Sequence, residues 1–351
     1  MKYLDILAQA WLAHLAPRLP DAPTVISTFA GGGGSSLGYS MAGYRELLAV
    51  EWDDNAVTTF KLNFPDVPVY HSDIAKLTVE ECLRLAGLKP GELDVLDGSP
   101  PCQGFSTAGK RMMDDPRNQL FREYVRLLRG LRPKVFVMEN VSGMVKGKMK
   151  LVFAEILRDL KASGYRVSAR LLNAMYFNVP QSRERMIFIG VRDDLGIEPG
   201  YPKAESRGIP PKIAFANCPE DEIKSLPDWL KEAAKYIDAG NYNHQSVQNA
   251  FMKVRGKSAS SQNTKLLSWD RVSCTLVKSE ISVTGIIHPD RQRYLTVSEM
   301  KRIASLPDEF LLAGDRKDKV SRIGNSVPPL LMRAIARNIN QNILTLVTKN
   351  V

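Results

Sequence analysis

Short apolar runs alternate with helical patterns along the first 192 residues, and this alternation restricts the fold more than any other feature of the chain. The apolar runs are TVIST, ELLAVE, VPVYHSDI, ELDVLDGSP, KVFVMENV, YRVSARLLN and RERMIFIGVR. Helical spacing appears in DDNAVTTFKLNF, NQLFREYVRLLRGLRP and LVFAEILRDLKASGY, the last of which closes at Gly164. Strands that alternate with helices are typical of α/β proteins. We therefore predict a doubly wound, mostly parallel sheet.

The second part of the chain is less regular. From about Gly196 to Gln262 it is rich in Pro, Gly, Asn, Ser and Lys, with only short periodic pieces. A helical pattern returns in LTVSEMKRIASLPDEF, and the end of the chain reads as a loop that enters a long amphipathic helix. We predict a first domain made of residues 1–194 and 318–351, and a smaller irregular domain of residues 195–317 that includes a hinge.

Charge and cysteine usage narrow the choice of partners. The net charge is +10 and the sequence pI is about 9.3, which favours a polyanionic partner. The four cysteines form no CxxC pair, and their spacing suits neither a zinc site nor a disulfide framework. We therefore expect no metal, and free thiols in a reducing compartment.

No apolar run reaches the length that crosses a membrane. The first 20 residues are apolar, but Leu4, Leu7, Trp11 and Leu15 fall at helical spacing and polar residues interrupt them. We expect an amphipathic helix packed on the body of the protein rather than a signal peptide.

A glycine cluster, FAGGGGSSLG, joins the first predicted strand to a helix. Glycines lack a Cβ, so backbone N–H groups at the start of such a helix can approach a ligand closely. Glu51 ends the next strand, where a carboxylate can accept hydrogen bonds from ribose hydroxyls, and Asp73 ends the third, where it could receive an adenine amino group. The cluster is not a strict GxGxxG fingerprint. Several nucleoside cofactors fit it, and a tight turn without a ligand is the alternative.

Cys102 stands where chemistry is expected. It leaves the carboxyl end of a predicted strand, behind two prolines that stiffen its backbone, and Glu139 and Asn140 end another strand. A thiolate suits addition to an electron-poor ring carbon, and an acid that engages a ring nitrogen makes the addition easier. A carboxyl group in a dry pocket can stay protonated for that task. The alternatives are an inert buried thiol and a solvated carboxylate at a strand end.

Gln181, Arg183 and Arg185 recur at a period of two in QSRERMIFIGVR. We predict that they share one face of a strand. Two such arginines are either surface charges or anchors for a phosphate or a base carbonyl.

Together these segments resemble the DNA (cytosine-5) methyltransferases of the bacterial and phage, restriction-modification type. FAGGGGSSLGY is similar to their first motif, DGSPPCQGFS to the catalytic motif, ENV to the carboxylate motif and QSRER to the QxRxR motif. RYLTVSEMKRIASLPDEF and RIGNSVPPLLMRAIA resemble the ninth and tenth motifs. Six motifs in order, over nearly everything except the variable middle, make the resemblance highly specific. It implies a Rossmann-like, S-adenosylmethionine-dependent methyltransferase fold with a small target-recognition domain.

The resemblance implies a role for each catalytic residue. Cys102 would attack C6 of a flipped-out cytosine, and Glu139 would engage N3 and the exocyclic amine. Arg185, together with Arg183, would hold the base carbonyl. C5 would then take the methyl group of S-adenosylmethionine, which gives 5-methylcytosine in duplex DNA.

The resemblance also implies which residues contact the cofactor and the DNA. The cofactor would lie against Phe29, Ala30, Gly31, Gly33, Glu51, Trp52, Asp73, Ile74, Pro100, Leu120, Asn325, Ser326 and Val327. The segment GFSTAGKRMMDD would close over the DNA. The expected DNA contacts are Gln103, Ser106, Lys110, Arg111, Gln181, Arg255, Lys257, Arg271 and Arg293. The stretch NYNHQSVQNAFMKVRGKSASSQN offers many polar groups for reading bases, and the sequence leaves open which ones do so.

Other functions remain open at this point. A tRNA cytosine methyltransferase would use the same scaffold, although its known members usually depart from PPCQGFS after the glutamine. A noncatalytic DNA-binding relative would retain the fold, and the glycine turn alone would allow a nicotinamide-dependent oxidoreductase. For the main hypothesis we expect a cytoplasmic monomer, in a bacterium or a phage-infected cell, that acts on double-stranded DNA without a membrane partner. A cognate restriction endonuclease that acts separately is compatible with this hypothesis.

Overall fold

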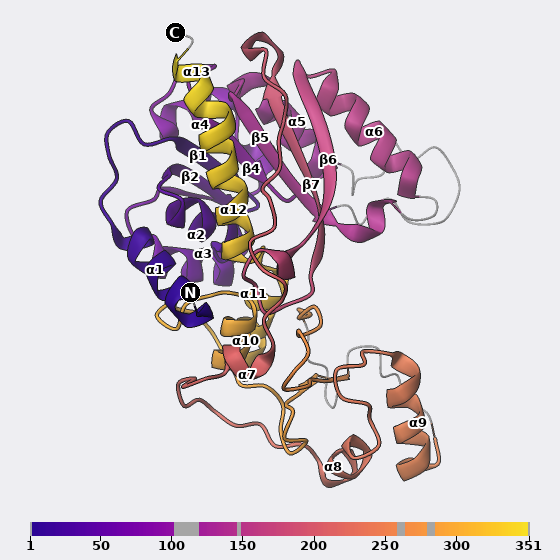
Figure 1. Ribbon diagram of the computed structural model, residues 1–351. Coiled ribbons are helices and arrows are strands. Elements are labelled where there is room, and N and C mark those ends of the chain that lie inside the picture. Colours follow the sequence, from indigo (N-terminus) through magenta and orange to yellow (C-terminus); the bar gives the residue numbers. More distant parts are fainter. Residues whose placement is uncertain (1, 102–118, 146–148, 258–263, 279–284, 350–351) are drawn as a thin grey trace. The chain divides into compact units, whose positions relative to one another are not determined.

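The computed structural model describes residues 2–101, 119–145, 149–257, 264–278 and 285–349 (Figure 1). The chain divides into two compact units. Unit 1 comprises Met1–Trp11, Ala174–Arg183 and Ala204–Leu331, and unit 2 comprises Leu12–Asn173, Glu184–Lys203 and Met332–Val351. The two units are defined by packing, and their boundaries differ from those of the predicted domains. The division into a domain of residues 1–194 and 318–351 and a domain of residues 195–317 stays a prediction.

Unit 2 is built on a seven-stranded sheet with the order β3-β2-β1-β4-β5-β7-β6. The strands are β1 (Thr24–Thr28), β2 (Arg45–Glu51), β3 (Val69–His71), β4 (Val95–Gly98), β5 (Val135–Val141), β6 (Tyr165–Asn173) and β7 (Glu184–Arg192). Strands β1 to β5 pair in parallel, whereas β7 runs antiparallel to both β5 and β6. The predicted doubly wound, mostly parallel sheet is confirmed.

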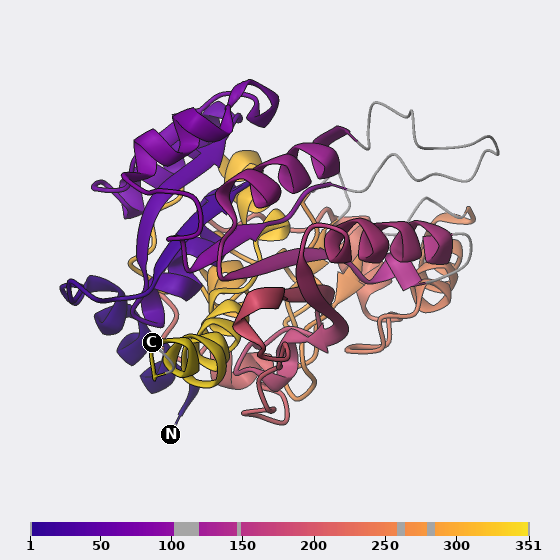
Figure 2. The ribbon, with the colours of Figure 1, turned by 90° about the horizontal axis from the view of Figure 1, so that it is seen from above.

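Helices cover both faces of this sheet (Figures 1 and 2). The elements of unit 2 are α2 (Gly34–Met41), α3 (Asp54–Asn63), η1 (Ile74–Lys76), α4 (Val79–Ala86), α5 (Gln119–Leu131), η4 (Ser142–Val145), α6 (Met149–Lys161), η6 (Asp193–Leu195), most of α12 (Pro329–Ile339), the π-helical turn η7 (Asn340–Leu344) and α13 (Thr345–Lys349). Helices α4, α5 and α6 bury apolar side chains on a core that includes Leu96, Tyr124 and Phe136. On the other face, the Tyr44 hydroxyl donates to the Ala336 carbonyl of α12 (2.9 Å). Helices thus pack on the sheet from both sides.

Unit 1 is less regular than unit 2. Its elements are η5 (Ala174–Tyr176), α7 (Pro211–Ala214), α8 (Asp228–Ala234), α9 (His244–Arg255), α10 (Val297–Ile303), α11 (Arg316–Asn325), and the two-residue strands β8 (Lys265–Leu266) and β9 (Ile286–Ile287). Leu230, Val247, Phe251, Ile287 and Tyr294 form part of a small apolar core. A capping box fixes the start of α10, because the Thr296 hydroxyl accepts from Glu299 N and the Glu299 carboxylate accepts from Thr296 N. Because the elements are short and joined by loops, side-chain contacts rather than an extended sheet hold this unit together.

The predicted amino-terminal helix is present as α1 (Tyr3–Leu15), but its buried stripe differs from the predicted one. Tyr3, Leu7 and Ala10 are buried, whereas Leu15 is 59% exposed. The Tyr3 hydroxyl donates to the Arg302 carbonyl (2.5 Å), so the tyrosine, which the leucine pattern omitted, fixes which face turns inward. No helix among the described ranges combines the length and the apolar character that spanning a bilayer requires.

A polar cluster lies inside unit 2, beneath α2. Glu46 of β2 accepts a hydrogen bond from the Ser36 hydroxyl (2.9 Å), and Asp97 of β4 accepts one from the Tyr39 hydroxyl (3.2 Å). Asp97 is 4% exposed, and Glu46 Oε2 is buried without a hydrogen-bond partner. Burial raises the pKa of Glu46 to about 7 and the pKa of Asp97 to about 8, because a charged carboxylate is poorly solvated there. The cluster therefore binds protons in the folded state that the unfolded chain releases.

This cluster predicts a loss of stability as the pH rises. In the folded protein the pKa of Glu46 lies above its ordinary value of 4.5. The stability that its bound proton contributes is therefore complete below pH 4.5 and is lost as the pH rises through 7. Glu46→Gln copies the protonated carboxyl, so it should raise the free energy of unfolding by roughly 3 kcal/mol at pH 8 and by less than about 1 kcal/mol at pH 5. Chemical unfolding followed by circular dichroism at both pH values measures the effect.

Glu81→Gln is the control, because Glu81 is a surface carboxylate paired with Arg84 and should leave the slope between pH 5 and pH 8 unchanged. If Glu46→Gln lost as much stability over this range as the wild type, Glu46 would not carry the effect.

Candidate active site

Five strand ends of unit 2 meet at one edge of the sheet. Because β3, β2, β1, β4 and β5 are parallel, their carboxyl ends point the same way. In α/β proteins this edge is where ligands bind. Phe29 follows β1, Glu51 ends β2, Asp73 follows β3, Pro100 follows β4, and Glu139 lies near the end of β5. The fold thus gathers residues that are far apart in the sequence.

The turn after β1 has an unusual backbone. Phe29 and Gly31 adopt left-handed conformations with φ of 55° and 57°, and Gly33, the N-cap of α2, has φ of 95°. A left-handed phenylalanine is uncommon and marks a constrained segment. A Cβ on Gly33 would lie 2.5 Å from the Phe64 ring, whereas a Cβ on Gly31 would meet nothing within 4 Å. Gly33 is therefore needed for packing, and Gly31 borders open space that a ligand could fill.

Glu51 ties the glycine turn to the end of β2. Its Oε2 accepts from Gly31 N (2.8 Å), and its Oε1 accepts from Trp52 N and Asp53 N (2.9 Å each). A carboxylate oxygen accepts about two hydrogen bonds, so Oε2, which accepts one, can still bind a ligand hydroxyl. The adjoining Trp52 side chain is 75% exposed and offers an indole face beside this carboxylate. The pair suits a nucleoside, with the carboxylate for the sugar and the ring for stacking.

The remaining cofactor candidates of unit 2 line the neighbouring strand ends. Asp73 is exposed and caps η1, where its Oδ1 accepts from Ala75 N (2.9 Å). Ile74 beside it is buried, and Phe29 and Leu120 pack against the core as half-buried residues. Asn325, Ser326 and Val327 belong to unit 1, so their part in the cofactor site stays a prediction.

A side chain of β5 holds the segment that leads to Cys102. The Nδ2 atom of Asn140, which is 4% exposed, donates to the Pro100 carbonyl oxygen (3.0 Å). Gly98 permits the close packing of β4 here, because a Cβ on it would lie 2.4 Å from Thr28 Oγ1. Cys102, Gln103, Ser106, Lys110 and Arg111 lie outside the described residues. The sequence predicted a chemical role for Glu139. It could not predict the hydrogen bond from Asn140 to Pro100, because that bond depends on how β4 and β5 lie side by side.

Glu139 and Arg185 form an ion pair next to this hydrogen bond. Arg185 Nε lies 2.7 Å from Glu139 Oε1, and both side chains are largely buried, at 14% and 12% exposure. Glu139 is paired with Ile187 across β5 and β7, which puts Arg185 two residues along on the same face. The guanidinium therefore fixes the direction of the carboxyl group.

The prediction that Gln181, Arg183 and Arg185 share one strand face is wrong, because β7 begins only at Glu184. Arg183 is buried and donates to the carbonyl oxygens of Leu276 (3.2 Å) and Gly324 (2.9 Å). Gln181 is 1% exposed, and its Oε1 accepts from Leu276 N (3.1 Å). Both side chains anchor backbone of unit 1. The DNA contact of Gln181 and the base contact of Arg183 stay predictions that this geometry does not favour.

The other cysteines are poor nucleophiles. Burial raises the pKa of Cys82 to about 12, of Cys218 to about 11 and of Cys274 to about 12, so these thiols stay protonated at neutral pH. All three are free in the described part of the chain. Within the same residues, no group of three or more His, Cys, Asp or Glu side chains is placed to hold a metal ion.

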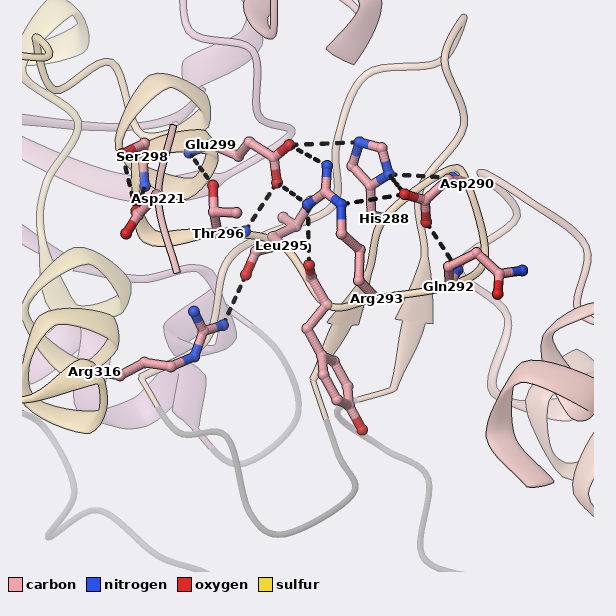
Figure 3. Close-up of polar contacts among 11 residues, drawn as sticks. Asp221, His288, Asp290, Gln292, Arg293, Leu295, Thr296, Ser298, Glu299 and Arg316 are labelled. Atoms are coloured by element: carbon pink, nitrogen blue, oxygen red, sulfur yellow. Dashed lines mark hydrogen bonds and ion pairs between the residues drawn. The ribbon is translucent and has the colours of Figure 1, made fainter. Parts of the chain in front are cut away.

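The predicted DNA-contact residues of unit 1 fall into two kinds. Arg255, Lys257 and Arg271 are exposed. Arg293 instead lies in a network that Figure 3 shows, where its Nη1 and Nη2 donate to Glu299 (2.8 and 2.7 Å) and its Nε lies 3.2 Å from Asp290. His288 contacts both carboxylates. A phosphate would have to compete with two carboxylates for Arg293, so its DNA contact stays a prediction with little support.

Comparisons with known proteins agree with this site. A sequence profile described as "C-5 cytosine-specific DNA methylase" matches residues 23–341. The Type II methyltransferase M1.HphI of Haemophilus parahaemolyticus is 35% identical over 331 residues, which cover 90% of this chain and 86% of that protein. The Type II methyltransferase M.XorII of Xanthomonas oryzae pv. oryzae is 33% identical over 363 residues, or 90% of this chain and 84% of its own.

Solved structures share the fold. An E. coli prophage protein described as a DNA modification methyltransferase aligns with a TM-score of 0.74 at 23% identity, over 92% of this chain and all of its own. DNMT2 of Spodoptera frugiperda aligns with a TM-score of 0.66 at 19% identity, over 93% of this chain and 100% of that one. The fold is that of the α/β methyltransferases. The chain belongs to the C-5 cytosine-specific DNA methylase family and is a DNA cytosine methyltransferase, as its motifs predicted.

The ion pair at Glu139 predicts a selective loss of activity. Arg185→Met removes the cation that orients the carboxyl group, so methyl transfer to DNA should fall by about 100-fold or more. Lys134→Met is the matched control, because it breaks the Lys134–Asp94 pair (2.7 Å), which lies at the opposite end of β5. Radiolabelled methyl incorporation and thermal unfolding of both variants make the comparison. An equal loss of activity in the two variants would assign Arg185 to the stability of the sheet alone.

Proposed function

We propose that this protein transfers the methyl group of S-adenosylmethionine to C5 of a cytosine that is flipped out of duplex DNA. The observation that carries the proposal is the hydrogen bond from Asn140 to the Pro100 carbonyl (3.0 Å). It joins the strand end that presents Glu139 to the segment that enters Cys102 two residues later. A nucleophile and a carboxyl group can therefore act on one ring.

The reaction follows from these two groups. The Cys102 thiolate adds to C6 and forms a C–S bond, while Glu139 hydrogen-bonds at N3 and the exocyclic amine as charge develops on the ring. S-adenosylmethionine would supply an electrophilic methyl group, which the electron-rich C5 of the adduct would take, so that a C5–carbon bond forms as the bond from that methyl group to the sulfonium sulfur breaks and leaves a neutral thioether. The C5 proton then passes to a base, and the electrons of the C5–H bond re-form the double bond as the C–S bond breaks and returns the thiolate. Arg185, through its bond to Glu139, keeps the carboxyl group aimed at the ring.

The residues of unit 2 fit this cofactor. Gly31 borders open space, the Glu51 carboxylate can accept from ribose hydroxyls, and the exposed indole of Trp52 can stack on adenine. Asp73 would receive the adenine amino group. Phe29, Ala30, Gly33, Ile74, Pro100 and Leu120 would complete the wall. The resemblance of RIGNSVPPLLMRAIA to the tenth motif assigns Asn325, Ser326 and Val327 to the same cofactor.

The substrate would be a specific sequence in duplex DNA. The net charge of +10 favours phosphate binding, and base extrusion costs a few kcal/mol that DNA contacts must offset. We assign phosphate contacts to Lys110, Arg111, Arg255, Lys257 and Arg271, and contacts around the extruded base to Gln103 and Ser106. We further assign catalysis to residues 1–194 and 318–351 and target recognition to residues 195–317.

The relatives suggest a setting. M1.HphI and M.XorII are named Type II methyltransferases, which favours a restriction-modification role for this chain. Within this role we propose a monomer in the bacterial cytoplasm, with any cognate endonuclease as a separate protein.

Replacement of the nucleophile tests the reaction. The wild type should transfer label from S-adenosylmethionine to cytosine C5 in mixed-sequence DNA and should leave tRNA unlabelled. Cys102→Ser should lower turnover by at least about 1,000-fold, because a serine hydroxyl is far less ionised and less nucleophilic than a thiol. Cys218→Ser is the control and should retain activity. Full activity of Cys102→Ser would eliminate the assigned nucleophile, and labelling of tRNA instead of DNA would change the substrate.

A pair of glycine variants tests the cofactor site without any turnover. Gly31→Ala and Gly87→Ala both place a Cβ in open space at a left-handed position, with φ of 57° and 66°. They should therefore destabilise the fold by similar amounts, about 1 kcal/mol. Only Gly31→Ala should weaken S-adenosylmethionine binding, by about 10-fold or more in isothermal titration calorimetry, because its methyl group enters the proposed site. Unchanged affinity in Gly31→Ala would move the cofactor elsewhere.

A further inference from the structure

Helix α9 of unit 1 has one apolar face and one polar face. Val247, Ala250 and Phe251 are buried in the core shared with α8, which packs beside α9 (Figure 1). Gln245, Asn249 and Met252 are exposed. They recur at i, i+4 and i+7, so they form a strip along the side of the helix opposite the core.

Two cations flank this strip, and each is held over an aromatic ring. Lys253 Nζ lies 3.8 Å from the centre of the Tyr236 ring, and Arg255 Cζ lies 4.5 Å from the Trp229 ring. Because a helix turns about 100° per residue, the two side chains leave α9 on opposite sides of the strip. Trp229 in turn packs edge-on against the buried Phe251 (5.3 Å between ring centres). The cations are therefore positioned before any partner arrives.

Helix α9 and the residues on both sides of it in the sequence are basic. No Asp or Glu occurs from Ala239 to Trp269, whereas this stretch contains Lys253, Arg255, Lys257 and Lys265. The acids of the neighbouring α8, Asp228 and Glu232, are paired with Lys231 and Lys235, so the positive charge of α9 is left to attract a polyanion. A helix-binding protein groove would need a broad apolar face, but apart from Met252 the strip is polar. DNA is the partner that this charge pattern favours.

The strip carries groups that can read bases. Gln245 Nε2 donates to Asn249 Oδ1 (2.9 Å), so the two amides are coupled and hold one another in place. Each amide contains both a donor and an acceptor, as the edges of base pairs in the major groove do. Met252 adds an apolar contact next to them, which suits a thymine methyl group. An α-helix also fits the width of the major groove.

We propose that α9 enters the major groove of the DNA substrate, where Gln245, Asn249 and Met252 contact base edges and Lys253 and Arg255 contact phosphates on the two sides. The inference rests on the proposed function, because it names the residues that would set its sequence specificity. The sequence already predicted that Arg255 contacts DNA. The base contacts of Gln245, Asn249 and Met252 are inferred from their position on α9.

Bisulfite sequencing of DNA from cells that express each protein tests the base contacts. The wild type should modify one sequence context, and Gln245→Ala combined with Asn249→Ala should lower the discrimination at one or more positions of that context by about 10-fold or more. Gln341→Ala combined with Asn342→Ala is the matched control, because these amides are exposed on η7 of unit 2, where Asn342 bonds to Asn338 one turn away (2.9 Å). This control should retain the wild-type context. An unchanged context in the α9 variant would overturn the base contacts.

Salt-dependent binding to duplex DNA tests the phosphate contacts independently of methylation. Lys253→Gln combined with Arg255→Gln should weaken binding to all sequences alike and reduce the slope of log affinity against log salt by about 2. Thermal unfolding identifies any loss that comes from misfolding. An unchanged affinity and slope would overturn the placement of α9 in the groove. If the wild type modified no cytosine at all, the proposed function would fail, and this binding experiment would still decide the role of the helix.

Discussion

Parallel pairing of β3, β2, β1, β4 and β5 is the constraint on which the chemistry of unit 2 depends. It sends the glycine turn, Glu51, Asp73 and the segment after β4 to one edge of the sheet. A hydrogen bond from the Asn140 side chain to the Pro100 carbonyl oxygen then couples the end of β5 to the segment that follows β4. The cofactor candidates of unit 2 and Glu139 thereby sit on one sheet, which holds them in fixed positions relative to one another.

Four carboxyl groups of unit 2 differ in the donors that they receive. Glu51 receives three backbone N–H groups, and Glu139 receives the Arg185 guanidinium. Glu46 and Asp97 have only hydroxyl donors, and burial raises the pKa of both. Glu51 and Glu139 lie at the site edge, whereas Glu46 and Asp97 lie beneath α2. The carboxyl groups at the site are thus held by N–H donors, and burial favours the neutral form of the two inside unit 2.

Much of this arrangement is predictable from the sequence, because periodicity identifies strands and helices and the motifs mark their ends. The seven strands and the roles suggested for Glu51 and Glu139 follow from such patterns. The pattern for Arg183 misleads, because a period of two in the sequence does not say where a strand begins, and β7 starts one residue after it. The leucine spacing of α1 likewise omits Tyr3, whose hydroxyl bond selects the buried face. The ring partners of Lys253 and Arg255 depend on contacts between α8 and α9, which a linear reading does not contain.

The hydrogen bonds that Arg183 and Gln181 make to main-chain atoms affect how the sequence of this protein can change in evolution. Their polar atoms hold main-chain atoms of Leu276 and Gly324, and the side chain of residue 276 takes no part in those bonds. These bonds use main-chain atoms, although residue 324 must stay a glycine because a Cβ there would lie 2.4 Å from the Val277 carbonyl carbon. The outer side of α9 takes no part in the attachment. Its residues can therefore change while the attachment persists, so a descendant could acquire a new target preference without first losing its fold.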